Sequence, residues 1–211
     1  MAFKEAKPFL FIVGLIGILA LFLYPPLALL PAGLFAYILY FFRDPERSVP
    51  TDPRAIVAAS DGKVIGVDEV VENILTKQKM KRVAVFLSVF DVHVNRTPYE
   101  GKVTQITYQP GEFLDARHGE VDLRNENQNW LLETPHGPMV VRQLAGLIAR
   151  RIVGWKKMGD TLTKGERFGM IRFGSRTDVY LPLECEVLVK AGERVQGGST
   201  IIAKWPENIS K

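Results

Sequence analysis

Residues 173–182 read Phe-Gly-Ser-Arg-Thr-Asp-Val-Tyr-Leu-Pro, and they place a Gly-Ser pair between two runs that are typical of β-strands. The run before the pair is Met-Ile-Arg-Phe, residues 170–173, and the run after it is Val-Tyr-Leu, residues 179–181. A Gly-Ser peptide that is held rigidly between strands can rearrange, because the Ser175 hydroxyl is able to attack the carbonyl carbon of Gly174. The amide becomes an ester, elimination then breaks the chain, and residue 175 is left as a ketone at a new N-terminus. The pattern therefore marks the peptide bond before Ser175 as a candidate self-cleavage site.

From Asp44 onward, short runs rich in β-branched and aromatic residues alternate with turn signals. Predicted strands cover residues 55–59, 63–67, 82–89 and 102–108. Residues 130–134 and 138–142 flank a Pro-His-Gly turn and predict a β-hairpin. Helical candidates are few, and residues 144–153 are the best of them. The sequence predicts an α+β fold that is dominated by antiparallel sheet.

A short motif repeats near the C-terminus. Lys-Gly-Glu-Arg at 164–167 and Ala-Gly-Glu-Arg at 191–194 each precede an apolar run. This repeated turn resembles the hammerhead half of lipoyl and biotinyl domains, so we expect the sheet to include a lipoyl-like half. No linker within 50–211 is long enough to divide this region into two soluble domains.

The N-terminal region is apolar. Residues 8–42 carry no charged side chain and form two apolar runs of 16 residues, 9–24 and 27–42, on either side of Pro25 and Pro26. Because paired prolines break helices, we expect two helical segments joined by a tight turn. Each run spans only about 24 Å of a roughly 30 Å hydrocarbon core, so a spanning hairpin and a re-entrant wedge both stay open. A cleaved signal peptide is disfavoured, since a second apolar run follows the first.

Basic residues flank this apolar region on both sides, at positions 4 and 7 before it and at positions 43 and 47 after it. Under the positive-inside rule, both flanks lie in the cytoplasm. The sequence thus predicts a membrane-anchoring helical hairpin at 1–47. It places a catalytic domain at 48–211, on the cytoplasmic face of a bacterial inner membrane.

The chain of 211 residues has a formal net charge of +4 and three short basic clusters, at 77–82, 150–151 and 156–157. Solvated loops account for most clusters of this kind. Attraction to an anionic membrane surface is the functional alternative. Nucleic acid is not an expected partner, because no basic stripe interleaves with aromatic residues.

The single cysteine, Cys185, stands between Glu184 and Glu186, whose negative charges disfavour a thiolate. A structural role is therefore expected for it. The sequence has no Cys/His/carboxylate spacing typical of zinc, and no metal is expected. It also has no Gly-rich phosphate loop ahead of a helix.

Two further stretches carry candidate catalytic residues. Asp61 lies in Ala-Ala-Ser-Asp-Gly-Lys, which is either an ordinary hairpin turn or a turn whose carboxylate orients a histidine. His93 lies in Asp-Val-His-Val-Asn, and in a strand Asp91, His93 and Asn95 would share one face. A polar row that emerges from an apolar strand is uncommon in a core, which favours a site.

The other two histidines, His118 and His136, stand in loop-like sequence and are weaker candidates. A second Gly-Ser pair, at Gly198 and Ser199, serves as an internal comparison. It lacks the flanking strand pattern, so no cleavage is expected there.

Three motifs, in this order along the chain, resemble the phosphatidylserine decarboxylase proenzymes, in the short form found in bacteria and archaea. They are Ser-Asp-Gly-Lys-Val at 60–64, Asp-Val-His-Val-Asn-Arg-Thr-Pro at 91–98 and Phe-Gly-Ser-Arg-Thr-Asp-Val at 173–179. Arg-Asn-Glu-Asn at 124–127 also resembles an Asn-Glu element of that family. The resemblance implies a self-cleavage triad with Asp61 as the acid, His93 as the base and Ser175 as the nucleophile.

By the same resemblance, cleavage would yield a β chain, 1–174, and an α chain, 175–211, that stay associated through the sheet. Ser175 would become the pyruvoyl group, the covalent cofactor of the family, and the serine amine of a phospholipid would form a Schiff base with its carbonyl. The implied reaction converts phosphatidylserine to phosphatidylethanolamine and CO2 in phospholipid biosynthesis, with His93 donating a proton after CO2 leaves. The sequence leaves the oligomeric state open, and a homo-oligomer is compatible with it.

The chain departs from the family pattern at two positions. Arg96 stands where longer members carry a second histidine, so His93 would have to serve both self-cleavage and decarboxylation. Arg96 is itself a candidate for binding the substrate phosphate, since guanidinium pairs well with phosphate oxygens. Some members also have Leu-Gly-Ser-Thr where this chain has Phe-Gly-Ser-Arg.

Two other functions stay open. A pyruvoyl decarboxylase of another serine-headed lipid, of the archaetidylserine type, would use identical headgroup chemistry. A non-catalytic, membrane-anchored lipoyl-like module that binds a partner would explain the hairpin and the repeated turns, but not the Asp-His-Asn row. An intact chain would favour the module, and a cleaved chain the decarboxylase.

Overall fold

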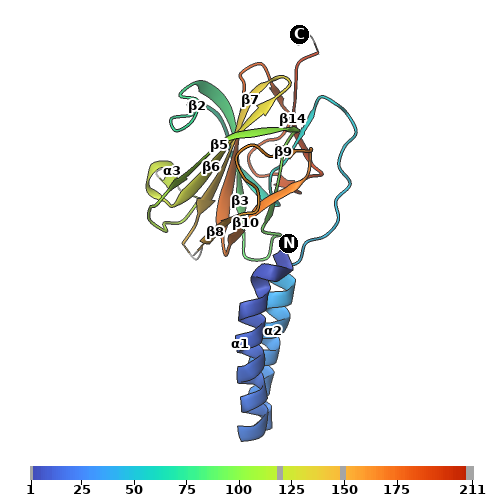
Figure 1. Ribbon diagram of the computed structural model, residues 1–211, viewed down its shortest axis with the longest axis vertical. Coiled ribbons are helices and arrows are strands. Elements are labelled where there is room, and N and C mark those ends of the chain that lie inside the picture. The colour runs from blue at the N-terminus through green and yellow to red at the C-terminus, as the bar shows by residue number, and fades with distance from the viewer. Residues whose placement is uncertain (1, 118–120, 148–150, 208–211) are drawn as a thin grey trace. The chain divides into compact units, whose positions relative to one another are not determined.

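The computed structural model describes residues 2–117, 121–147 and 151–207. The chain divides into two compact units, Met1–Glu46 and Arg47–Lys211, and Figure 1 labels their helices and strands. This division does not test the prediction that the first unit is a membrane anchor and the second a catalytic domain.

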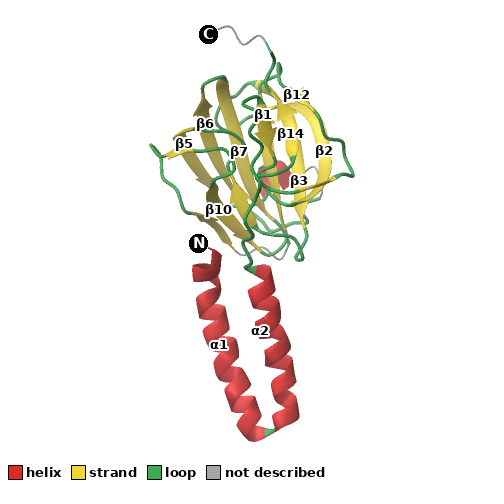
Figure 2. Cartoon of the chain, turned by 90° about the vertical axis from the view of Figure 1, so that its right-hand side faces the viewer, coloured by secondary structure: helices red, strands yellow, loops and turns green. Residues whose placement is uncertain are grey.

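The first unit is a helical hairpin. Helix α1 (Ala2–Leu23) is followed by the 3₁₀ turn η1 (Pro25–Ala28) and helix α2 (Leu29–Phe41), and the two helices lie side by side in Figure 2. Tyr24 is extended, with φ at −158°, because a residue that precedes proline is pushed out of the helical region. The fixed φ of proline then suits the first position of η1. The predicted helical hairpin is confirmed.

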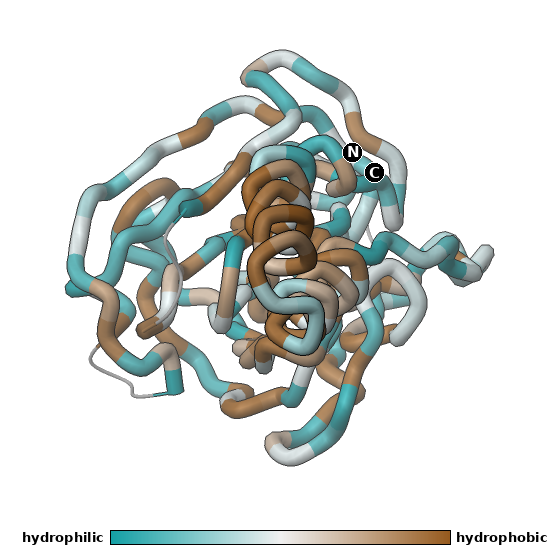
Figure 3. The backbone as a smooth tube through the Cα atoms, turned by 90° about the horizontal axis from the view of Figure 1, so that it is seen from below, coloured by the Kyte–Doolittle hydropathy of each residue, from teal (hydrophilic) through white to brown (hydrophobic). Residues whose placement is uncertain are grey.

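Most residues of this hairpin are apolar, as the brown colour of both helices in Figure 3 shows, and many of their side chains are exposed. Phe22 is 83% exposed and Leu29 is 75% exposed. At 22 residues, α1 is about 33 Å long, enough to cross a hydrocarbon core of roughly 30 Å, whereas the 13 residues of α2 reach only about 20 Å. By length and composition α1 is a candidate membrane span, a criterion that a signal sequence or a buried core helix also meets.

Over its described residues, the second unit contains three antiparallel sheets and the short helix α3 (Val121–Arg124). The largest sheet has the order β13 (Arg194–Val195), β2 (Gly62–Val71), β3 (Lys79–Leu87), β11 (Ser175–Leu181), β7 (Gly137–Ala145), β6 (Asn127–Thr134), β5 (Gly101–Gln109) and β9 (Thr161–Leu162). The smaller sheets have the orders β1 (Ala55–Val57), β14 (Ile201–Lys204), β12 (Glu186–Val187) and β4 (Val94–Arg96), β10 (Arg167–Arg172), β8 (Arg151–Gly154). The predicted α+β fold with mostly antiparallel sheet is confirmed.

Both Gly-Glu-Arg repeats form turns that lead into strands, β10 and β13. Their glycines, Gly165 and Gly192, have φ values of +76° and +102°, a region that favours glycine. The predicted hairpin around Pro-His-Gly is also confirmed, since β6 pairs with β7 and Thr134 lies opposite Gly137.

Two local predictions are wrong. Residues 144–153 do not form a helix: 144–145 end β7 and 151–153 lie in β8, while 148–150 are outside the described residues. Leu144 is fixed by pairing with Arg176 on β11, and such tertiary pairing overrides a modest helix propensity. The Asp-Gly pair at 61–62 is not a hairpin turn either, because β1 pairs with β14 while β2 pairs with β3 and β13.

The two faces of the central strand β11 differ in chemistry. Val179 and Leu181 lie in the main hydrophobic cluster, together with residues of β3, β6 and β7. The alternate residues, Arg176 and Asp178, point to the opposite face and are also buried. The large sheet therefore has an apolar core on one face and a buried polar layer on the other.

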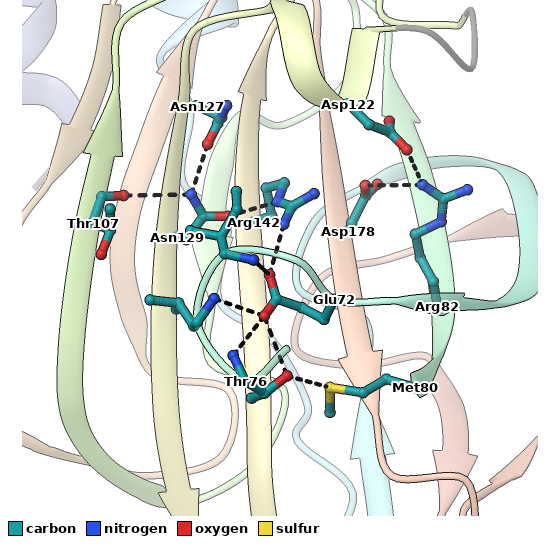
Figure 4. Close-up of polar contacts among 12 residues, drawn as sticks. Glu72, Thr76, Met80, Arg82, Thr107, Asp122, Asn127, Asn129, Arg142 and Asp178 are labelled. Carbon is teal, nitrogen blue, oxygen red and sulfur yellow. Dashed lines mark hydrogen bonds and ion pairs between the residues drawn. The ribbon is translucent and has the colours of Figure 1, made fainter. Parts of the chain in front are cut away.

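The polar layer contains a buried ion pair between Glu72 and Arg142, at 2.8 Å (Figure 4). Glu72 also accepts hydrogen bonds from the backbone N–H groups of residues 74–76. Burial alone would raise the pKa of Glu72, but these N–H donors and the Arg142 guanidinium outweigh it and hold the pKa below its ordinary value. Glu72 is therefore ionised at neutral pH and ties the turn after β2 to β7.

Replacing Glu72 with glutamine should destabilise the protein by about 3–5 kcal/mol at pH 7, because the buried Arg142 would lose its counter-charge. The stabilisation is fully present above the pKa of an unfolded glutamate, about 4.3, and is lost as the pH falls through the lower native pKa. Urea unfolding of both proteins in detergent, at neutral and acidic pH, measures the two effects.

The matched control is Glu69→Gln on β2, three residues before Glu72, which removes an exposed ion pair with Lys79. This variant should unfold at nearly the urea concentration of the wild-type protein, since exposed pairs contribute little. An equal loss of stability in the two variants would contradict the importance of the buried pair.

Candidate active site

Ser175 is the first residue of β11 and lies between two strands, opposite Leu87 of β3 and Ala145 of β7. It is fully buried. Within the described residues, its hydroxyl oxygen Oγ has no hydrogen-bond partner. A buried hydroxyl without a partner is uncommon and calls for an explanation. Here it leaves a potential nucleophile uncommitted, next to the Gly174 carbonyl.

The two residues before Ser175 have an unusual backbone conformation. Phe173 has φ at +65° and Gly174 at +54°, so the chain passes through the left-handed region twice in succession. For a non-glycine residue such as Phe173, this conformation costs roughly 1–2 kcal/mol. The turn carries the chain from β10 to β11, which belong to different sheets. Strain is thus stored directly beside the predicted cleavage site.

His93 is fully buried and contacts the same turn. Its ring nitrogen Nδ1 lies 2.9 Å from the main-chain carbonyl oxygen of Asp91, and the N–H of Gly174 donates to Nε2 at 3.3 Å. A carbonyl can only accept and an N–H can only donate, so both contacts require the neutral tautomer with its proton on Nδ1. The Nε2 lone pair therefore faces Gly174, beside the predicted cleavage site, where a general base would be needed.

Asp91, His93 and Asn95 do not form the predicted row on one strand face, because only Asn95 lies within a strand. Asp91 and His93 precede β4, and Asp91 turns its carboxylate to the N–H and hydroxyl of Ser88, at 2.8 and 2.7 Å. Asn95 lies within β4, donates to Thr177 at 3.4 Å and accepts from Gln143 at 2.7 Å. His93 reaches Gly174 from the segment before β4, and not from a strand face that it shares with Asp91 and Asn95.

Asp61 and Arg96 make other contacts. The Asp61 carboxylate pairs with Arg47 at 2.7 Å and accepts from the N–H of Gly197 at 2.8 Å. Arg96 is buried and donates to the carbonyl of Gly165 at 3.1 Å. The orienting role of Asp61 and the phosphate-binding role of Arg96 stay predictions.

A pocket of about 280 Å³ opens beside Gly174. Its lining residues come from four segments and are Phe86, Ser88, Val89, Asp115, Ala116, Arg117, Gly146, Leu147 and Gly174. The walls are mainly apolar, while Arg117 donates to Asp115 at 2.9 and 3.0 Å. The pocket thus offers apolar walls and one pair of opposite charges next to the candidate cleavage site. Sequence reasoning missed residues 115–117, because they carry no motif.

The remaining candidates lie away from this arrangement. His136 occupies the turn before β7, where its Nε2 lies 3.1 Å from the Tyr99 hydroxyl, and His118 is outside the described residues. Burial, with Glu184 adding to it, raises the pKa of Cys185 to about 12, so this thiol is a poor nucleophile. Among the described residues, no group of three or more His, Cys, Asp or Glu side chains could hold a metal ion.

Gly146 fixes the end of β7 against the Gly174 carbonyl. A Cβ atom at position 146 would lie 2.4 Å from the Gly174 oxygen and 3.1 Å from its carbonyl carbon. Both neighbours are backbone atoms, so a side chain fits only if the backbone at Gly174 moves. Glycine at 146 is thus part of what shapes the site.

Gly146→Ala should therefore slow the predicted cleavage about 10- to 100-fold, since displacing reacting atoms by about 1 Å costs rate on that scale. The readout is the time course of two fragments after synthesis, followed by intact mass. The control is Gly66→Ala, whose added Cβ would meet Ala84 at an ordinary 3.8 Å. Cleavage of both variants at the wild-type rate would contradict a role for the close approach.

Comparison with known proteins agrees with these features. The family model for phosphatidylserine decarboxylase matches residues 34–203. A phosphatidylserine decarboxylase proenzyme from Symbiobacterium thermophilum is 45% identical over 205 residues, covering 97% of this chain and 95% of the relative. Proteins of the same name from Syntrophus aciditrophicus and Geotalea uraniireducens are each 44% identical, over 93% and 96% of this chain and 94% and 95% of their own. As its three motifs predicted, the chain belongs to the phosphatidylserine decarboxylase family.

Proposed function

We propose that this protein is a self-cleaving, pyruvoyl-dependent decarboxylase that converts phosphatidylserine to phosphatidylethanolamine and CO2. The observation that carries the proposal is the buried, unpartnered hydroxyl of Ser175, which directly follows two left-handed residues. The neutral Nε2 of His93 beside Gly174 adds a base in the right place. The names of the relatives supply the substrate.

In the precursor, His93 takes the Ser175 hydroxyl proton while Oγ attacks the Gly174 carbonyl carbon. The C–N bond breaks, the nitrogen gains the proton, and an ester joins Gly174 to Oγ. Loss of the Ser175 α-proton then breaks the bond between Cβ and Oγ and releases the Gly174 carboxylate. The resulting enamine rearranges to an imine, and water hydrolyses it to a ketone and ammonia.

The residues present fit such a group at position 175. The ketone supplies an electron sink for the pair left behind when CO2 departs. The apolar walls of the pocket remove water from the headgroup carboxylate, which favours loss of its charge as CO2. His93 holds a proton near the reacting carbon.

Arg117 is better placed than Arg96 to hold the lipid phosphate. Its guanidinium lines the pocket, whereas Arg96 is buried against Gly165 and lies outside the lining residues. A guanidinium binds phosphate oxygens in a bidentate way. The phosphate would replace Asp115 as the partner of Arg117.

A phospholipid substrate also accounts for the N-terminal hairpin. We infer that residues 1–47 anchor the enzyme to the bilayer, with the basic flanks of the hairpin on the cytoplasmic side of the inner membrane. The catalytic domain, 48–211, would then meet its substrate at the membrane surface. After cleavage, fragments 1–174 and 175–211 would stay together through the sheet.

The test is the intact mass of the purified protein beside a Ser175→Ala variant. Two wild-type fragments that divide after Gly174 are expected, the smaller one lighter by one ammonia than simple hydrolysis would give. The variant should stay whole and release no CO2 from phosphatidylserine vesicles. A well-folded wild-type chain that also stays whole would overturn the proposal and favour a binding module. CO2 release from an ether-linked serine lipid but not from phosphatidylserine would assign the archaetidylserine-type reaction instead.

Asp61→Asn should slow self-cleavage by about 100-fold, because the family triad assigns this carboxylate the stabilisation of protonated His93. Asparagine can still accept from the N–H of Gly197 but loses the ion pair with Arg47, so the thermal midpoint of the variant is measured beside its cleavage rate. The control is Asp91→Asn, which leaves the main-chain carbonyl that contacts His93 in place. Wild-type cleavage rates in Asp61→Asn would remove Asp61 from the mechanism and leave the Asp91 carbonyl as the orienting group. Both rates come from intact mass over time.

A further inference from the structure

Arg176 follows the cleavage-site serine directly, and this is the position where some family members carry threonine. It is only 2% exposed, so its charge needs partners inside the protein. Its Nε and NH2 groups donate to the two carboxylate oxygens of Asp178, at 2.7 and 2.6 Å. NH2 also donates to Asp122 of helix α3. The arginine thus joins its own strand to a distant segment of the chain.

Asp122 is shared between two arginines. Besides Arg176, it accepts from Arg82 of β3, which is also held by Asp68 at 2.6 and 2.9 Å. Figure 4 shows Asp122 and Asp178 on the same side of the sheet as Arg82. The side chain of Asp68 is 42% exposed and that of Asp122 is 21% exposed. Asp68 and Asp122 therefore both bind Arg82, but of these two carboxylates only Asp122 also binds Arg176.

The Arg176 pair also lies close to the pocket. Arg176 is paired across the sheet with Phe86, which lines the pocket. Asp122 lies in α3, five residues after Arg117 of the pocket wall. The ion pair therefore connects the start of β11 with α3, which follows the pocket residues 115–117 in the sequence.

We propose that the Arg176–Asp122 ion pair clamps the new chain end after self-cleavage and so positions residue 175 for the decarboxylation step. This inference rests on the proposed function. Before cleavage, Ser175 is held by its covalent link to β10, and afterwards it becomes a terminus, where chains tend to fray. Asp122 belongs to fragment 1–174 and Arg176 to fragment 175–211, so the pair joins the two fragments one residue from the reacting group.

The experiment compares Asp122→Asn with Asp68→Asn in the full-length protein in detergent. Both variants remove a carboxylate from Arg82, but only the first weakens the hold on Arg176. Asp122→Asn should still cleave into two associated fragments, while kcat falls about 10- to 100-fold at a nearly unchanged KM. Asp68→Asn should keep kcat within about fivefold of wild type, as expected for a partly exposed pair.

A second readout does not depend on turnover. A hydrazide probe that labels the ketone at residue 175 should react faster in Asp122→Asn than in wild type, because a loosened end is more accessible. Asp122→Glu, which keeps the charge, should recover part of kcat and part of the protection. These measurements are made well below the thermal midpoint of each variant.

The outcomes separate the clamp from the reaction it serves. Equal losses of kcat in Asp122→Asn and Asp68→Asn would overturn the clamp, and so would unchanged labelling of a cleaved Asp122→Asn protein. A wild-type chain that never cleaves would overturn the proposed function, and the clamp would fall with it. Cleaved wild type with a selective defect in Asp122→Asn supports both.

Discussion

The structure depends on one crossing point, where the chain passes from β10 to β11 through Phe173 and Gly174 in the left-handed region. The two strands belong to different sheets, so the change of sheet is completed within two residues. Pairing of β11 with β3 on one side and β7 on the other fixes Ser175 and holds the unfavourable conformation in place. The strain, the burial of the Ser175 hydroxyl and the contact between Gly174 and His93 all follow from this topology.

The same topology explains why a break at this point need not release the smaller fragment. Strands β11 to β14 all follow Ser175, and they are interleaved with strands that precede it. β11 lies between β3 and β7, β13 pairs with β2, and β14 pairs with β1. The fragment is thus held by hydrogen-bonded ladders in two sheets. These ladders do not fix the orientation of residue 175 at a new chain end. The buried charges around Arg176, the next residue, can fix it.

Short-range patterns predicted much of this fold, because alternation and turn chemistry are properties of a few neighbouring residues. The hairpin of β6 and β7 and the turn at residues 173–174 between two strands are examples. Long-range packing decided the rest. The apolar content of 144–153 suits a helix, yet Leu144 pairs with a residue of β11 that no local pattern could identify. Likewise, Asp61 takes its partners from positions 14 and 136 residues away. The pocket around Arg117 is also formed by residues from distant parts of the sequence. No sequence motif indicates the pocket or the partners of Asp61.

The geometry of His93 bears on how one imidazole can serve two steps. Arg96 replaces the second histidine of longer members, and it is turned toward the Gly165 carbonyl. In the proposed reactions His93 would then act alone, and its Nδ1 proton is held by the main-chain carbonyl of Asp91. This leaves Nε2 as the only ring atom that exchanges protons, and it faces Gly174. Cleavage would break the bond between Gly174 and residue 175 and leave the Gly174 N–H in fragment 1–174, so the contact that places Nε2 beside the chain end is not lost with the broken bond. In the proposed reactions a single histidine would serve both steps, because the reacting residue stays at position 175, next to the residue that Nε2 contacts.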